Sequence, residues 1–88
     1  MALFRVETKQ VNSEIWNGDC ETIDAMSALE AAAIMADYLN NCLLQYSGFN
    51  GNDRADKITE IMNTMQFRVS NPRGYGWFGK VFNYSDLK

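Results

Sequence analysis

Apolar and polar side chains alternate along the first part of the chain. Phe4, Val6 and Thr8 fall on one face of an extended segment, with charged residues between them. Such alternation is typical of a strand with one buried face, and it predicts a strand over residues 2–10. The alternation slips by one position near residues 11–13, which indicates a bulge or a short turn there.

A tight turn and a second strand are predicted next. Asn17-Gly18 is the dipeptide that most favours a two-residue hairpin turn, because both central positions of a type I′ turn need a positive φ. The second strand is therefore expected over about residues 19–24.

A long helix follows this hairpin. Ser27 and Glu30 have the spacing of a capping box, in which the serine hydroxyl accepts a hydrogen bond from the glutamate amide. The segment Ala28–Tyr46 contains no glycine or proline, and Gly48 favours the end of the helix through a left-handed cap. The stripe of this helix that we expect to be buried comprises Leu29, Ala32, Ala33, Ala36, Leu39, Leu43 and Tyr46. The face that we expect to be exposed to solvent comprises Glu30, Asp37, Asn41 and Gln45.

A second, shorter helix and a third strand are predicted after a loop. Asp53 can cap a helix over residues 54–64, in which the apolar residues keep helical spacing. Met65, Phe67 and Val69 then alternate as a strand.

The last part of the chain has the pattern of a hairpin. Residues 71–74 predict a turn, with proline pre-set for its second position, and Tyr75–Asn83 predicts the returning strand. Gly76 and Gly79 indicate bulges or a close backbone approach. The order β-β-α-α-β-β predicts an α+β fold: one domain over residues 1–88, with a four-stranded, mostly antiparallel sheet and two helices packed on one face.

Length and composition fit one small folded domain. The chain has 88 residues, of which 47% are hydrophobic and 12% aromatic, and this range is typical of folded proteins. The start lacks the layout of a signal peptide, and no apolar run approaches the ~20 residues that span a bilayer. We therefore expect a cytoplasmic protein that does not enter a membrane, with Cys20 and Cys42 as free thiols.

Charge is distributed in blocks. Residues 10–53 hold seven acids and no lysine or arginine, whereas residues 54–88 hold six lysines and arginines against three acids. The net charge of -3 therefore combines a block of -7 with a tail of +3 and a small positive start. A split of this kind indicates a charged partner. The alternative interpretation is that the acids only keep the protein soluble.

No residue pattern in the chain identifies a reaction. Histidine is absent, the two cysteines lack the spacing of a zinc site, and no phosphate-binding or nucleophile motif occurs. We expect no enzymatic activity, no cofactor and no metal. Asp19, Glu21 and Asp24 are close enough in sequence for acid–base work or cation binding, but they lack the spacing of a calcium loop. A solvated strand edge is the simpler interpretation.

Five of the eleven aromatic residues lie in the segment 75–84. Together with Arg68 and other nearby basic residues they could form a base-stacking platform for single-stranded nucleic acid. The alternative is that they fill the core. Trp77 and Phe78 point to opposite faces of a regular strand, so one of them is expected to be exposed or to lie in an interface.

Two segments carry a resemblance to known proteins. Leu3-Phe4-Arg5-Val6-Glu7 as an opening strand, and Ile23-Asp24-Ala25-Met26-Ser27-Ala28-Leu29-Glu30-Ala31-Ala32 as a strand entering a capped helix, resemble small phage-encoded α/β proteins, including some anti-CRISPR inhibitors. The resemblance implies an acidic surface that imitates nucleic acid and occupies the basic channel of a CRISPR effector in the host cytoplasm. It transfers no individual functional residue.

The leading hypothesis is a non-enzymatic, phage-encoded interaction protein that blocks the nucleic-acid-binding site of a host complex. Its acids would meet lysines and arginines that normally grip phosphate, with an aromatic anchor that slows release. The expected partner-binding residues are Glu14, Asp19, Glu21, Asp24, Glu30, Asp37, Tyr75 and Trp77. The alternatives are a single-stranded nucleic-acid-binding protein that uses the C-terminal hairpin, and a small-ligand-binding oligomer; monomer and homodimer both stay open.

Overall fold

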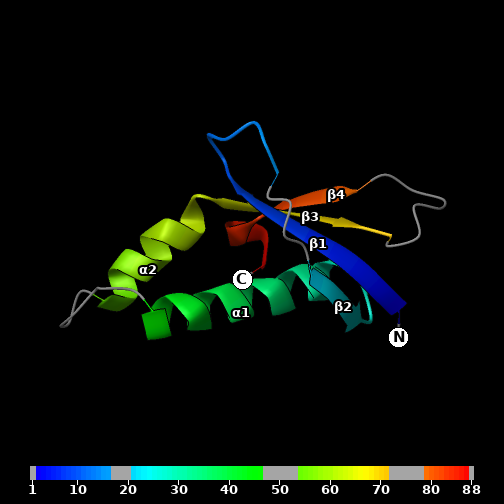
Figure 1. The fold of residues 1–88 in the computed structure, drawn as a ribbon, viewed down its shortest axis with the longest axis horizontal. Coiled ribbons are helices and arrows are strands. Elements are labelled where there is room, and N and C mark those ends of the chain that lie inside the picture. The colour runs from blue at the N-terminus through cyan, green and yellow to red at the C-terminus, as the bar shows by residue number, and fades with distance from the viewer. Residues whose placement is uncertain (1, 17–20, 47–53, 72–78, 88) are drawn as a thin grey trace.

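Four strands and three helical segments are seen in a computed structural model that describes residues 2–16, 21–46, 54–71 and 79–87 (Figure 1). In chain order they are β1 (Ala2–Gln10), β2 (Glu21–Ala25), α1 (Ala28–Tyr46), α2 (Arg54–Asn63), β3 (Met65–Ser70), β4 (Lys80–Asn83) and the 3₁₀ helix η1 (Tyr84–Leu87). The strands form one antiparallel sheet in the order β2-β1-β3-β4. The predicted α+β class and the order of the strands and helices are confirmed.

The strand β1 lies between β2 and β3 in the sheet. It pairs Phe4 with Ile23 of β2 and Val6 with Val69 of β3. Val6, Val69 and Phe67 are fully buried, because the even-numbered residues of β1 and the odd-numbered residues of β3 face the same layer of helices. The alternation predicted for the first and third strands is confirmed.

A short turn follows β1, as the slip in alternation predicts. The Ser13 N–H donates a hydrogen bond to the Gln10 carbonyl at 3.0 Å, and the Val11 N–H donates to the Thr64 carbonyl at 2.7 Å. The second bond anchors the turn to the start of β3. The β2 strand runs from Glu21 to Ala25, one residue further than predicted, and Asn17-Gly18 lies outside the described residues.

The helix α1 covers one face of the sheet (Figure 1). Its bounds match the prediction, and its first turn is capped because the Ser27 Oγ accepts a hydrogen bond from the Glu30 N–H at 3.1 Å. Its small residues let it lie close to the sheet, since Ala31, Ala32 and Ala36 are all buried.

The buried arc of α1 differs from the predicted stripe at its first turn. Leu29 is 48% exposed, whereas Ala31 and Met35 are buried. At 100° per residue, the buried arc is centred between Ala32 and Met35, which leaves Leu29 at its border. The expectation that Leu29 is a core residue is wrong.

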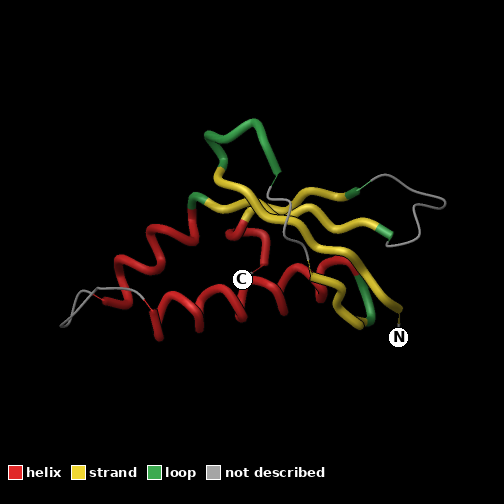
Figure 2. The backbone as a smooth tube through the Cα atoms, in the orientation of Figure 1, coloured by secondary structure: helices red, strands yellow, loops and turns green. Residues whose placement is uncertain are grey.

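The second helix and the 3₁₀ helix complete the core at one end of the sheet. Ile58 and Met62 of α2 are buried, and α2 packs against α1 and η1. Figure 2 shows all the helical segments on one side of the sheet, with the loop after β1 on the other side. We call the face on that other side the open face.

The C-terminal strand is shorter than predicted. It spans Lys80–Asn83, and Tyr84 begins η1, whereas residues 72–78 lie outside the described part of the chain. Phe82 and Tyr84 are half-buried against the core, which supports core-filling for these two aromatics. In the described ranges, no helix is both long enough and apolar enough to cross a membrane.

Candidate functional site

The predicted acidic residues lie on different parts of the molecule. Glu14 is exposed in the loop after β1, and Asp24 is exposed on β2. On α1, Asp37 is exposed and Glu30 is half-buried in the first turn. Asp19, Tyr75 and Trp77 lie outside the described residues. The backbone of Glu21 pairs with Val6 of β1.

Glu14 and Asp24 do not form one acidic cluster on the hairpin. Ser13, the neighbour of Glu14, accepts a hydrogen bond from the Lys9 Nζ through its carbonyl at 2.8 Å. Asp24 instead pairs with Leu3 at the other end of β1. Leu3 and Lys9 are six residues apart on one strand, which corresponds to about 20 Å.

A groove opens between β2 and α1. Its volume is about 280 Å³, and it is lined by Ile23, Ile34, Met35 and Tyr38. Met35 is buried, whereas Ile34 is 40% and Tyr38 is 55% exposed. The apolar side chains of α1 therefore continue past the core and reach solvent beside β2.

Two acidic residues of α1 lie within one turn of Ile34, and a third acid lies on the opposite face of β2. On a helix with 3.6 residues per turn, Glu30 lies one turn before Ile34, and Asp37 lies on the same side one turn after it. Asp24 follows Ile23 on β2, and its side chain points to the open face because successive strand residues alternate. Neither β2 nor α1 contains a lysine or an arginine.

We name this region the β2–α1 surface. It comprises the groove residues Ile23, Ile34, Met35 and Tyr38, the neighbouring Glu30 and Asp37 of α1, and Asp24 on the other face of β2. Its combination of an apolar groove with nearby acids favours a ligand that is both apolar and positively charged. Of this set, only Asp24, Glu30 and Asp37 are among the site residues predicted from the sequence. No sequence pattern indicates the groove, because the groove depends on how α1 is rotated against β2.

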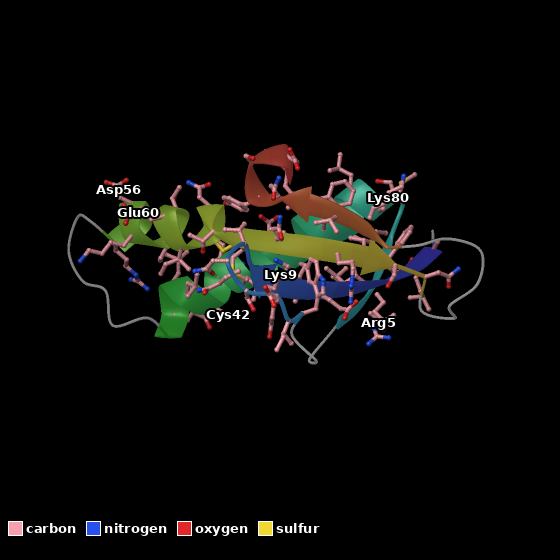
Figure 3. The ribbon with its side chains drawn as sticks, turned by 90° about the horizontal axis from the view of Figure 1, so that it is seen from above. Arg5, Lys9, Cys42, Asp56, Glu60 and Lys80 are labelled. Atoms are coloured by element: carbon pink, nitrogen blue, oxygen red, sulfur yellow. The ribbon has the colours of Figure 1, made fainter. Side chains whose placement is uncertain are left out.

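The open face of the sheet carries a second cluster. Arg68 donates to Glu7 from Nε to Oε1 at 3.0 Å and from Nη2 to Oε2 at 2.9 Å. The Trp16 ring covers this pair, with its centroid 4.7 Å from the Arg68 Cζ and 5.3 Å from the Lys9 Nζ. Figure 3 shows Lys9 and Arg5 along this face.

The Arg68 guanidinium is therefore engaged by Glu7 and Trp16 of the same chain. Glu7 is only 9% exposed, and the bidentate ion pair uses two of the five N–H donors of the guanidinium, while the cation–π contact with Trp16 covers one of its faces. This arrangement weakens the expectation that Arg68 serves a base-stacking platform. Neither Glu7 nor Trp16 was among the expected site residues, because their contact with Arg68 depends on the register of β1 and β3.

The described residues also bear on metals and thiols. Within the parts of the chain that the structure describes, no three Cys, Asp or Glu side chains lie together as a metal site would require. Cys42 is a free thiol and is half-buried, and Cys20 lies outside the described residues. Comparisons of the chain with protein-family models, with curated proteins and with solved structures give no match.

Proposed function

We propose that this chain is a non-enzymatic interaction protein that binds a cationic partner protein through the β2–α1 surface. One observation carries the proposal: the groove beside Ile34 and Tyr38 is open to solvent, α1 carries Glu30 and Asp37 within one turn of Ile34, and neither α1 nor β2 contains a lysine or an arginine. Acidic residues that only kept the protein soluble would not require an exposed apolar groove beside them.

The two parts of the surface would have different roles in binding. Exposed charges on Asp24 and Asp37 attract a basic partner over a distance and speed association, an effect that weakens as salt rises. The groove takes an apolar side chain of the partner and excludes water from it, which slows dissociation.

We further propose that the cationic partner is the nucleic-acid-binding site of a host complex, such as a CRISPR effector, so that the protein acts as an inhibitor. The support is the acidic block over residues 10–53 together with the resemblance of the two N-terminal segments to phage-encoded inhibitors. A basic channel built to hold phosphate offers the charge that the β2–α1 surface lacks.

Binding of single-stranded nucleic acid is the second candidate, and the structure gives it less support. Arg68 is paired with Glu7 and covered by Trp16, and Phe82 and Tyr84 are half-buried against the core. The residues that would still carry this function are in segment 72–78, outside the described part of the chain.

The proposed function is tested with charge reversals at matched positions. Asp24→Lys with Asp37→Lys alters the β2–α1 surface, and Asp56→Lys with Glu60→Lys makes the same change in net charge on α2, where both acids are exposed (Figure 3). Wild type and both double variants are immobilised and presented with a lysate of the natural host, and captured proteins are identified by mass spectrometry.

We expect wild type and the α2 variant to capture the same partner, and the Asp24/Asp37 variant to lose it. The partner should carry a basic surface, and its capture should fall as salt rises. Equal capture by all the proteins would contradict the proposal and would leave the acids as a solubility feature.

A further inference from the structure

We infer that the partner enters the β2–α1 surface as an extended segment that adds a strand to the free edge of β2. This inference rests on the proposed function and deepens it by naming the mode of binding and the chemistry of the segment. The occupant is a strand in which apolar residues alternate with lysine or arginine.

The edge of β2 is open for such pairing. In the sheet order β2-β1-β3-β4, β2 has a neighbour on one side only among the described strands. Edge strands are usually protected by short length, charged side chains, proline or a covering element. The five residues of β2, Glu-Thr-Ile-Asp-Ala, include no lysine or proline, and their two charges are acidic, so they oppose an acidic strand and favour a basic one. The second edge of β2 therefore offers backbone donors and acceptors to an added strand.

The side chains beside this edge determine which segment fits. Ile23 faces α1 and lines the groove with Ile34 and Tyr38, whereas Thr22 and Asp24 face the open side because strand residues alternate. An added strand has the same alternation. Its residues on the helical side would lie against the groove, and its residues on the open side would lie beside Asp24, where a lysine or an arginine forms a favourable cross-strand pair.

Charge argues against a second copy of the chain as the occupant. Self-pairing of β2 would bring the Asp24 side chains of both copies to one face of the joined sheet and both acidic α1 helices to the other. Like charges gathered in one interface oppose association. A basic segment removes this repulsion, so the observed charges favour a different partner.

The experiment uses the full chain and short peptides of alternating valine and lysine. One version carries N-methyl groups on the amides of one edge, and another carries them on the opposite edge of the same strand. N-methylation removes a donor and blocks strand pairing without changing charge. Affinity is measured by fluorescence anisotropy, and the amides of residues 22–25 are followed by NMR and hydrogen exchange. A peptide of alternating valine and glutamate is the charge control.

We expect the unmodified valine–lysine peptide to bind and to protect amides of β2. N-methylation should weaken binding by about tenfold or more on the edge that faces β2 and have little effect on the other edge. Ile34→Ser should also weaken binding, and Ile15→Ser, which alters an 80% exposed residue of the loop after β1, should not.

Several outcomes would overturn the inference. Equal binding of both N-methylated peptides, or of the glutamate peptide, would show that no strand pairs with β2 in this way. A dimer detected by sedimentation that protects β2 without any peptide would show that a second copy is the occupant. If these tests fail while the Asp24/Asp37 reversal still abolishes capture of the partner, the proposed function stands and the strand-addition mode falls.

Discussion

Glu7 and Arg68, which are 61 residues apart in the sequence, form a bidentate ion pair across β1 and β3 on the open face of the sheet. Both side chains are largely shielded from solvent: that of Glu7 is 12% exposed and that of Arg68 is 35% exposed. Trp16 closes over the pair from the loop after β1. This contact joins the two inner strands on the face opposite the described helices.

Removal of one partner should destabilise the fold. Glu7→Gln leaves the partly buried guanidinium of Arg68 without its counter-charge, and we expect a loss of about 1–3 kcal/mol in the free energy of unfolding. Urea denaturation measures the change, with Glu60→Gln on the exposed side of α2 as the control. A Glu7→Gln protein as stable as wild type would show that the pair adds nothing.

Gly79 provides the space in which the Arg68 side chain lies. A Cβ at position 79 would lie 2.8 Å from the Arg68 Cγ and 3.1 Å from the Arg68 Cδ. Gly79→Ala is therefore expected to cost about 1 kcal/mol by overpacking. The cost should disappear in an Arg68→Ala background, and a double-mutant cycle measures this coupling. A cycle with no coupling energy would contradict the contact.

Local signals predict α1 well and predict its rotation poorly. The cap at Ser27 and the absence of glycine and proline define Ala28–Tyr46 correctly, because these signals act within a few residues. The face that α1 buries depends on where β2 and α2 lie, so Leu29 was wrongly placed in the core. The groove at Ile34 arises from the same rotation.

Contacts between distant segments were beyond prediction for a similar reason. The alternation in β1 indicates that Glu7 faces away from the helices, but only the pairing of Glu7 with Arg68 shows why a carboxylate is buried there. The prediction for Gly79 is a bulge or a close backbone approach, whereas its nearest neighbour is the Arg68 side chain, whose position depends on the register of β3 and β4. The spacing of residues along the chain does not indicate how β1 pairs with β3 or how β3 pairs with β4.

A matched pair of substitutions tests the orientation of α1. Ala32 is fully buried, so Ala32→Asp should unfold the domain, because an unpaired buried charge costs several kcal/mol against a total stability of about 5–10 kcal/mol. Leu29→Asp should change stability by less than about 1 kcal/mol, since an acid in the first turn of a helix is favourable. Thermal melts followed by circular dichroism measure both. Unfolding of the Leu29→Asp protein with a stable Ala32→Asp protein would reverse the assignment.

The state of Cys42 has a direct chemical test. Cys42 is a free, half-buried thiol, and we expect it to react with a thiol reagent more slowly in the native protein than after denaturation. Denatured protein should react at both Cys20 and Cys42. Protein purified without oxidant that reacts at neither position, even when denatured, would show that these cysteines form a bridge.

The measurement that most directly tests binding through the β2–α1 surface is the kinetics of partner binding by surface plasmon resonance. The captured partner is purified and its association and dissociation rates are compared for wild type, Ile34→Ser, the Asp24→Lys/Asp37→Lys variant and the Asp56→Lys/Glu60→Lys control. We predict slower, less salt-dependent association for the Asp24/Asp37 variant and faster dissociation for Ile34→Ser, with the α2 control close to wild type. Rates that change equally in both charge-reversed proteins, and not at all in Ile34→Ser, would contradict binding through this surface.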